Sequence, residues 1–267
     1  MRQAALNRLQ VGKTEKYLYE KIEEDGFIHI TLIDPEKMNK IEEVVKAAEA
    51  AGSSSFMVGG STSHRTSDYE EAIAKIKSNS KLPVIIFPSN VASIARGADA
   101  IWFMSLLNSS NPYYIVGAQV LGIKTIRELG LETIPMAYLI LGTGGAAGYI
   151  GNAKPLSFEM PELTVGYAMA AEALGFRFIY LEAGSGVKTH VPEKLISMVK
   201  RSISVPLIVG GGIRDGSAAE EVVSSGADII VTGDILEETC TLEEKLLEIV
   251  EGGRKGVVKK HGMKGLG

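Results

Sequence analysis

Eight short apolar segments recur along the chain, and a longer stretch with helical spacing follows each of them. They lie at 27–33, 54–58, 83–87, 100–105, 134–141, 177–183, 205–209 and 228–232. Most of them are near-continuous in Ile, Val, Leu, Phe and Met instead of alternating with polar residues. This pattern is typical of parallel strands that are covered on both faces.

The stretches between these segments have the periodicity of amphipathic helices. In the first of them Ile41, Val44 and Ala48 fall on one helix face, and a glycine at 52 marks its end. Helices are predicted at 36–51, 69–77, 113–129, 163–174, 193–201, 217–225 and 237–251, with a short, weaker one at 91–96. Strand and helix therefore alternate eight times.

Eight strand–helix units in roughly 230 residues match the size of a (β/α)8 TIM barrel. A doubly wound open sheet is the alternative, but it usually carries a glycine-rich loop after its first strand, where this chain has Asp34-Pro35-Glu36. The sequence therefore predicts one α/β TIM-barrel domain over 1–267, with an N-terminal helical extension over 1–26 and a basic tail over 252–267. The glycine-rich stretch 142–161 is long for such a domain, which indicates a lid or binding loop; a crossover without a role is the alternative.

The amino-acid composition limits which binding partners and which cellular compartment we expect. The net charge of −4 argues against a nucleic-acid partner. Cys240 is the only cysteine, and no apolar run approaches the ~18 residues of a membrane span, so we expect a soluble cytoplasmic protein. The basic tail is interpreted as a solvated, partly frayed end; weak attraction to anionic lipid, and so peripheral membrane contact, is the alternative.

The predicted ends of strands seven and eight are rich in glycine. They read Gly210-Gly211-Gly212 and Gly233-Asp234. Glycine lets backbone N–H groups approach an anion closely, and TIM barrels commonly bind phosphate at these two loops. We therefore expect a phosphate site here. Asp234 would contribute its backbone amide, because its carboxylate has the wrong charge.

Two carboxylates are predicted at the same end of the barrel. Glu182 ends strand six, where it can act as a general base toward a hydroxyl; a salt bridge to a neighbouring loop is the alternative. Tyr180 can bond a phosphate or pack in the wall. Asp34 ends strand one and can ligate Mg²⁺ together with the hydroxyl of Ser61, whereas capping of the helix that begins at Pro35 is the alternative.

Five of these segments, at 31–35, 58–61, 180–186, 210–214 and 232–234, resemble a known family in sequence and in order. The family is the geranylgeranylglyceryl phosphate synthases of archaea, grouped with bacterial heptaprenylglyceryl phosphate synthases. The resemblance spans about 27–251, and 105–109 and 117–119 are similar to the family's region after strand four. The Gly-Gly-Gly-Ile turn is shared with many phosphate-binding barrels, but Tyr-Leu-Glu-Ala-Gly-Ser-Gly combined with Ile-Asp-Pro is specific.

The resemblance implies a prenyltransferase that joins geranylgeranyl diphosphate to the C3 hydroxyl of sn-glycerol 1-phosphate, forming the first ether bond of archaeal lipids. It implies that Asp34 and Ser61 hold Mg²⁺ and that Glu182 orients or deprotonates the hydroxyl. The residues that it assigns to glycerol 1-phosphate are Tyr180, Leu181, Glu182, Ala183, Gly184, Ser185, Gly186, Gly211, Gly212, Gly233 and Asp234. Family members often assemble, so a homo-oligomer is expected.

One departure concerns the first strand. Bacterial relatives carry a lysine before Leu-Asp-Pro, where this chain has Thr31 and Leu32. The longer chain, the N-terminal extension and the 142–161 stretch look more like the archaeal branch, which favours the C20 chain over a longer one. The candidates for an apolar prenyl groove are Trp102, Phe103, Met104, Tyr138 and Leu139, with Trp102 as the residue that limits chain length; ordinary barrel wall is the alternative for most of them.

Three rival functions stay open. The first is heptaprenylglyceryl phosphate synthase activity with a longer chain. The second is a phosphosugar isomerase or lyase, which shares the phosphate loops but has no need of Asp34 and Ser61 at one ion. The third is a barrel that only binds a phosphorylated lipid precursor.

Overall fold

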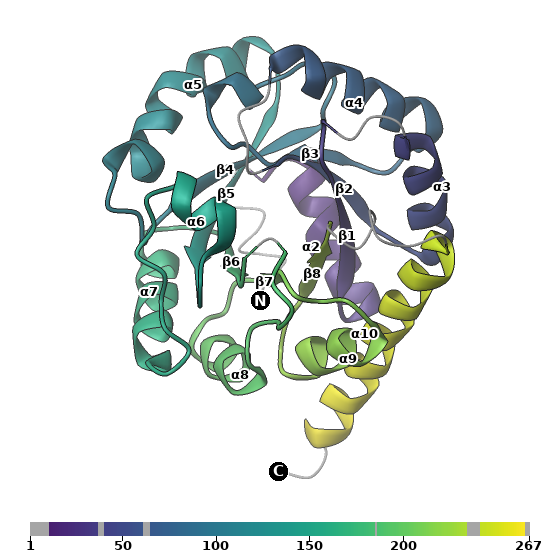
Figure 1. Ribbon diagram of the computed structural model, residues 1–267, viewed down its shortest axis with the longest axis vertical. Coiled ribbons are helices and arrows are strands. Elements are labelled where there is room, and N and C mark those ends of the chain that lie inside the picture. Colours follow the sequence, from purple (N-terminus) through teal and green to yellow (C-terminus); the bar gives the residue numbers. More distant parts are fainter. Residues whose placement is uncertain (1–10, 37–39, 61–64, 185, 234–240, 265–267) are drawn as a thin grey trace.

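The sheet is a closed barrel of eight parallel strands, each paired with the next along the chain, and β1 also pairs with β8 (Figure 1). The structure is a computed structural model, which describes residues 11–36, 40–60, 65–184, 186–233 and 241–264. The strands are β1 Ile28–Ile33, β2 Ser55–Val58, β3 Val84–Ile86, β4 Ala100–Leu106, β5 Glu132–Ile140, β6 Phe178–Glu182, β7 Leu207–Gly210 and β8 Ile229–Thr232. The predicted TIM barrel is confirmed.

Helices surround the barrel (Figure 1). They are α2 Lys13–Asp25, α3 Ile41–Ala51, α4 Thr66–Asn79, α5 Ala118–Glu128, α6 Gly145–Ile150, α7 Pro161–Ala173, α8 Glu193–Ser202, α9 Gly216–Ser224 and α10 Leu242–Lys264, with the 3₁₀ turn η2 Val91–Ser93 and the π-helical turn η3 Tyr113–Gly117. The predicted helix at 113–129 is thus a π turn that continues into α5. The 142–161 stretch contains α6 and is not a featureless loop.

Strand side chains alternate between the barrel interior and the helix layer. Ile28 and Ile30 of β1 pack in the interior with Trp102 and Phe178, whereas Ile33 packs outward against α3. Both faces are apolar because both are buried, which accounts for the near-continuous apolar runs of the sequence. No helix in the described part of the chain is long and apolar enough to cross a bilayer.

Helix α2 covers the N-terminal end of the barrel. Its Leu18 is buried against the barrel interior. The Glu132 carboxylate accepts from the backbone amides of Thr14 and Glu15 at 2.7 and 2.8 Å, and so caps the start of the helix. Arg177 donates twice to the fully buried Glu15 carboxylate, at 2.5 and 2.7 Å. The predicted N-terminal helix is therefore an integral part of the barrel.

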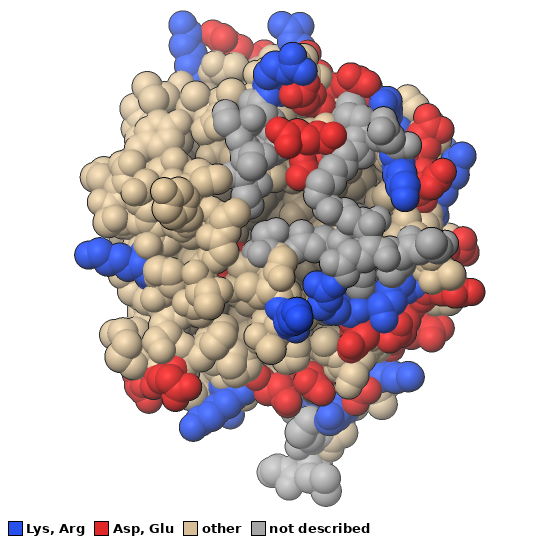
Figure 2. All heavy atoms as spheres, in the orientation of Figure 1, with Lys and Arg blue, Asp and Glu red and all other residues tan. Residues whose placement is uncertain are grey.

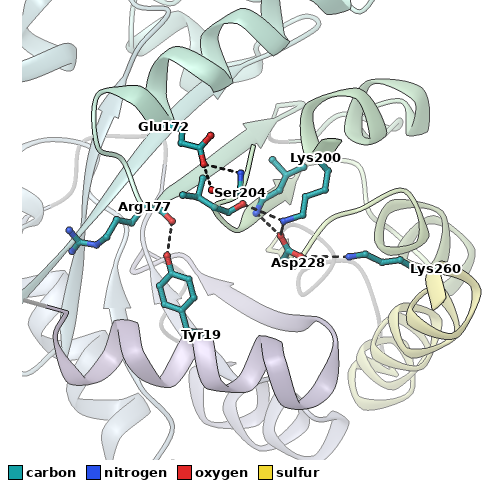
Figure 3. A network of polar contacts seen from close by, with 9 residues as sticks. Tyr19, Glu172, Arg177, Lys200, Ser204, Asp228 and Lys260 are labelled. Carbon is teal, nitrogen blue, oxygen red and sulfur yellow. Dashed lines mark hydrogen bonds and ion pairs between the residues drawn. The ribbon is translucent and has the colours of Figure 1, made fainter. Parts of the chain in front are cut away.

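The C-terminal segment was predicted to be a solvated, partly frayed end, and the structure differs from this prediction. Helix α10 continues to Lys264, and it packs between α9 and α3 (Figure 1). A side chain at Gly252 would overlap the backbone of Gly216, so glycine is what lets the two helices approach. Lys260 lies 3.6 Å from Asp228, which also pairs with Lys200 (Figure 3). The tail of the sequence is thus packed against the barrel as far as Lys260.

We expect Arg177→Met to lower the free energy of unfolding by about 3–5 kcal/mol, because it leaves the buried Glu15 carboxylate without its cation. Denaturant unfolding followed by circular dichroism measures this. The matched control is Lys16→Met, which breaks the exposed pair of Lys16 with Glu20 and should cost at most about 1 kcal/mol. Equal losses in the two variants would contradict the role given to the buried pair.

Candidate active site

Two hollows lie together at the C-terminal ends of the strands, the end of the barrel that faces the viewer in Figures 1 and 2. The larger is a cleft of about 670 Å³ whose lining includes Asp34, just after β1, and Glu182, the last residue of β6. The smaller, of about 60 Å³, is lined by the turns after β7 and β8. The two predicted carboxylates therefore share one rim of the barrel.

Three glycines line the smaller hollow, which we call the anion subsite. Gly211 and Gly212 have φ values of +81° and +72°, and a Cβ at Gly211 would lie 2.6 Å from Glu182 Oε1. Glycine is therefore required here both for its backbone conformation and for its lack of a side chain. Gly233 completes the lining after β8. This arrangement agrees with the predicted phosphate turns.

Arg214 lines the anion subsite directly after the glycine turn, and the sequence patterns did not single it out as a site residue. The next residue, Asp215, caps α9 by accepting from the amide of Ala218 at 2.9 Å. Position alone could have indicated Arg214, because a cation that follows a phosphate turn is within reach of the same anion.

Glu182 is buried at the point where the two hollows meet. Its side chain lines both of them and is 8% exposed as a residue. The amide of Gly184 donates to Oε1 at 2.7 Å. Burial, and then the neighbouring Glu182 charge, raise the pKa of Tyr138 well above its ordinary value, so Tyr138 stays protonated beside the carboxylate.

Three aromatic rings pack beside Glu182. Tyr138 and Tyr180 meet edge to face with ring centroids 5.1 Å apart, and Phe87 lies 5.4 Å from Tyr138 and 5.8 Å from Tyr180. A side chain at Gly210 would overlap the Tyr180 hydroxyl, so this glycine makes room for the ring. Phe87 was not predicted as a site residue, because only the fold brings the end of β3 next to β5 and β6.

The large cleft extends from the rim into the helix layer and is mostly apolar. Trp102 and Tyr138 line it from the barrel interior, and Val44 of α3 and Ile126 of α5 line it from outside the sheet. Ile150 of α6 contributes a further wall, so the predicted 142–161 binding loop forms part of the cleft. Figure 2 shows a largely uncharged surface over the neighbouring α5, α6 and α7.

Four of the five residues predicted for the prenyl groove line the large cleft, and the fifth does not. Trp102, Phe103, Met104 and Tyr138 all line the cleft. Leu139 instead packs in the helix layer, because it points to the opposite face from Tyr138. Trp102 is fully buried, and its Nε1–H has no acceptor among the described residues.

The residues predicted at 180–186 also divide into those that line a hollow and those that pack in the helix layer. Tyr180 and Glu182 line the anion subsite, whereas Leu181 and Ala183 pack against the helices, so only their backbone is available to a ligand. The backbone of Gly184 lies against the Gly211 turn, and Gly186 lines neither hollow. Three predicted site residues lie outside the described part of the chain: Ser61, Ser185 and Asp234.

The donor set at Asp34 suits a hard cation. Asp34 lines the cleft, and its carboxylate accepts from the amide of Glu36 at 3.0 Å within a turn. The alternative, capping of a helix that begins at Pro35, differs from the structure, where α3 begins at Ile41. The described residues contain no cluster of three or more His, Cys, Asp or Glu that could hold a metal ion. One carboxylate fits Mg²⁺, which usually takes one or two together with substrate phosphates and water. Lys40 adds a positive charge to the same cleft.

The chain is a (β/α)8 barrel, a class of fold that commonly binds phosphate at the loops after strands seven and eight, where the anion subsite lies. It belongs to the PcrB family, whose model matches residues 19–253.

Its relatives include the geranylgeranylglyceryl phosphate synthases of Methanothermobacter marburgensis, 49% identical over 90% of this chain and 98% of that protein, and of Pyrococcus horikoshii, 46% identical over 93% and 99%. Among solved structures, the synthase of Thermoplasma acidophilum in complex with sn-glycerol-1-phosphate has a TM-score of 0.85 at 41% identity and covers 89% of this chain and 98% of its own. A thiamine phosphate pyrophosphorylase from Pyrococcus furiosus, at 14% identity and a TM-score of 0.56, shares the fold alone.

We expect Gly211→Ala to weaken binding of sn-glycerol 1-phosphate at least tenfold, because the new methyl group would push on Glu182 and on the Gly184 backbone. Calorimetric titration measures this. Gly130→Ala is the control, since Gly130 has φ +68° but open space around its Cβ position. Both variants should lose about 1–2 kcal/mol of stability from the left-handed backbone, but only Gly211→Ala should lose affinity. Unchanged affinity in Gly211→Ala would contradict the subsite.

Proposed function

We propose that the chain is a geranylgeranylglyceryl phosphate synthase, which transfers the prenyl group of geranylgeranyl diphosphate to the C3 hydroxyl of sn-glycerol 1-phosphate. The observation that carries this proposal is that the anion subsite and the long apolar cleft meet at Glu182. A phosphorylated alcohol in the first and an apolar diphosphate in the second would bring hydroxyl and allylic carbon to the same carboxylate. The family relatives support the same activity.

The glycerol phosphate would be held by its phosphate. The backbone amides after β7 and β8 would bind the phosphate oxygens, with Arg214 adding charge. The glycerol carbons would then extend toward Glu182, whose carboxylate accepts from the Gly184 amide. Fixing the carboxylate in advance positions the hydroxyl for attack without a further loss of freedom.

The diphosphate would lie at the end of β1, next to the β8 side of the anion subsite. Asp34 would hold Mg²⁺, together with Ser61 as the resemblance implies, and the bound ion supplies positive charge for the departing diphosphate. Lys40 would contribute a second charge. The geranylgeranyl chain would occupy the apolar cleft toward α3 and α5, with Trp102 as the wall that limits its length. A phosphosugar needs no such cleft, which favours the prenyl substrate.

The reaction then breaks one bond and forms one. The bond between the allylic carbon and the diphosphate oxygen breaks, and the electron pair leaves with the diphosphate. The C3 oxygen of glycerol phosphate bonds to the allylic carbon, and its proton passes to Glu182. Positive charge that develops on the allylic carbon faces the rings of Phe87, Tyr138 and Tyr180, which stabilise it electrostatically.

The direct test is product analysis by mass spectrometry with sn-glycerol 1-phosphate, Mg²⁺ and isoprenoid diphosphates of increasing length. We expect the C20 ether as the main product, its loss when EDTA removes Mg²⁺, and a fall in rate of at least tenfold in Asp34→Asn. A dominant product of longer chain length would assign the heptaprenyl-type activity instead. Turnover of a phosphosugar without ether formation would overturn the proposal.

Glu182→Gln should lower kcat by about 10²–10⁴-fold while KM for glycerol 1-phosphate changes little, because the amide keeps the size of the side chain but accepts no proton. Steady-state kinetics measure both constants. The control is Glu162→Gln, on the exposed first turn of α7, which should leave both unchanged. Full product formation by Glu182→Gln would remove the proposed base, whereas absence of ether from the wild-type protein itself would favour a barrel that only binds the precursor.

A further inference from the structure

A chain of four polar side chains lies on the helix-facing side of the barrel, at the seam between β1 and β8. His29 Nδ1 is 2.8 Å from Ser53 Oγ, and His29 Nε2 is 2.8 Å from Thr232 Oγ1. The hydroxyls of Thr31 and Ser53 are 2.9 Å apart. All four residues are buried. None of these four residues belongs to the catalytic machinery described above, yet the last side chain of the network lies at the anion subsite.

Thr232 provides that last side chain. It is the last residue of β8, and it lines the anion subsite together with Gly233. Pairing with β7 stops one residue earlier, at Gly210 opposite Val231, so Thr232 is held in the sheet from the β1 side, where it pairs with Thr31. His29 pairs with Ile230 and reaches Thr232 diagonally on the same face.

The protonation state of His29 suits a fixed role. Burial lowers its pKa from 6.5 to about 4, so the ring is neutral at pH 7 and offers one donor and one acceptor. Each ring nitrogen then bonds one hydroxyl, and the hydroxyl protons can point to match either tautomer. The ring is therefore locked in place, with its nitrogens satisfied without a charge.

The contact between β1 and β8 would not need a polar network for stability alone. Elsewhere, as between β6 and β7, the helix-facing side of the barrel is closed by apolar side chains such as Leu181 and Val209. Well-packed apolar residues in place of a buried polar network are often neutral or stabilising. A network that is satisfied throughout does, however, fix the orientation of its members.

We infer that His29 is a positioning residue for the anion subsite: through Thr232 it fixes the peptide group that leads into Gly233, whose backbone faces the phosphate. This inference rests on the proposed function, because that function assigns the phosphate of glycerol 1-phosphate to the subsite. It gives a role in substrate affinity to a side chain that touches no substrate.

Two substitutions of His29 separate positioning from packing. A glutamine places its amide nitrogen near the position of Nε2 and keeps the bond to Thr232, whereas an asparagine reaches only the position of Nδ1 and loses it. We expect His29→Asn to raise KM and Kd for sn-glycerol 1-phosphate about tenfold with kcat within about twofold of the wild type. His29→Gln should stay within about threefold in all three constants.

Substitutions of Thr232 test the same hydrogen bond through its other partner. Thr232→Val removes the hydroxyl at constant shape and should raise KM as His29→Asn does, and Thr232→Ser should restore it. Ser55→Ala is the control, since it removes a buried hydroxyl that donates to Pro83 O at 3.0 Å, away from the seam. It should lower the melting temperature without changing KM.

The outcomes are distinct. If His29→Asn and Thr232→Val lower the melting temperature but leave KM and Kd unchanged, the network serves only the seam and the inference is overturned. Calorimetric titration with inorganic phosphate reads the subsite without any turnover. If the wild-type protein binds phosphate but forms no ether, the proposed function fails, while loss of phosphate affinity in His29→Asn relative to His29→Gln would still support positioning.

Discussion

The turn from Gly210 to Gly212 sets how closely the ends of β6 and β7 approach each other, and the site is arranged around that approach. Tyr180 packs where a side chain at 210 would be, Glu182 and Gly184 lie against position 211, and the backbone near Thr189 occupies the place of a side chain at 212. Gly211 and Gly212 also line the anion subsite. The absence of side chains in this turn therefore serves two purposes: it makes room for Glu182, and it leaves backbone close to where the proposed phosphate would bind.

The strands and the chemistry at their ends were predictable because both are local properties of the sequence. Each strand is an apolar run between turn residues, and the C-terminal ends of parallel strands must meet at one rim. Glu182, Asp34 and the glycine turns could therefore be placed together before any coordinates. The family resemblance added which substrate each of them would meet.

Side-chain direction was harder to predict. When both faces of a strand are apolar, the sequence does not show which residues face the barrel interior, so Leu139 was grouped with Tyr138, and Leu181 and Ala183 with Glu182. Phe87 depended on contacts between strands that are distant in sequence. The glycines of α10 were misleading, because they indicate a weak helix in isolation but are required for its close packing against α9.

Helix α10 has a consequence for how the protein is made. It packs against α3, near the start of the chain, and against α9, near its end, and the strand that closes the barrel immediately precedes it. During synthesis on the ribosome, β1 therefore waits with one edge unpaired until β8 has emerged. Vectorial folding can build the intermediate strand–helix units, but the barrel closes only after β8 is available, and the interval before closure is when the chain is most exposed to misassembly or in need of a chaperone.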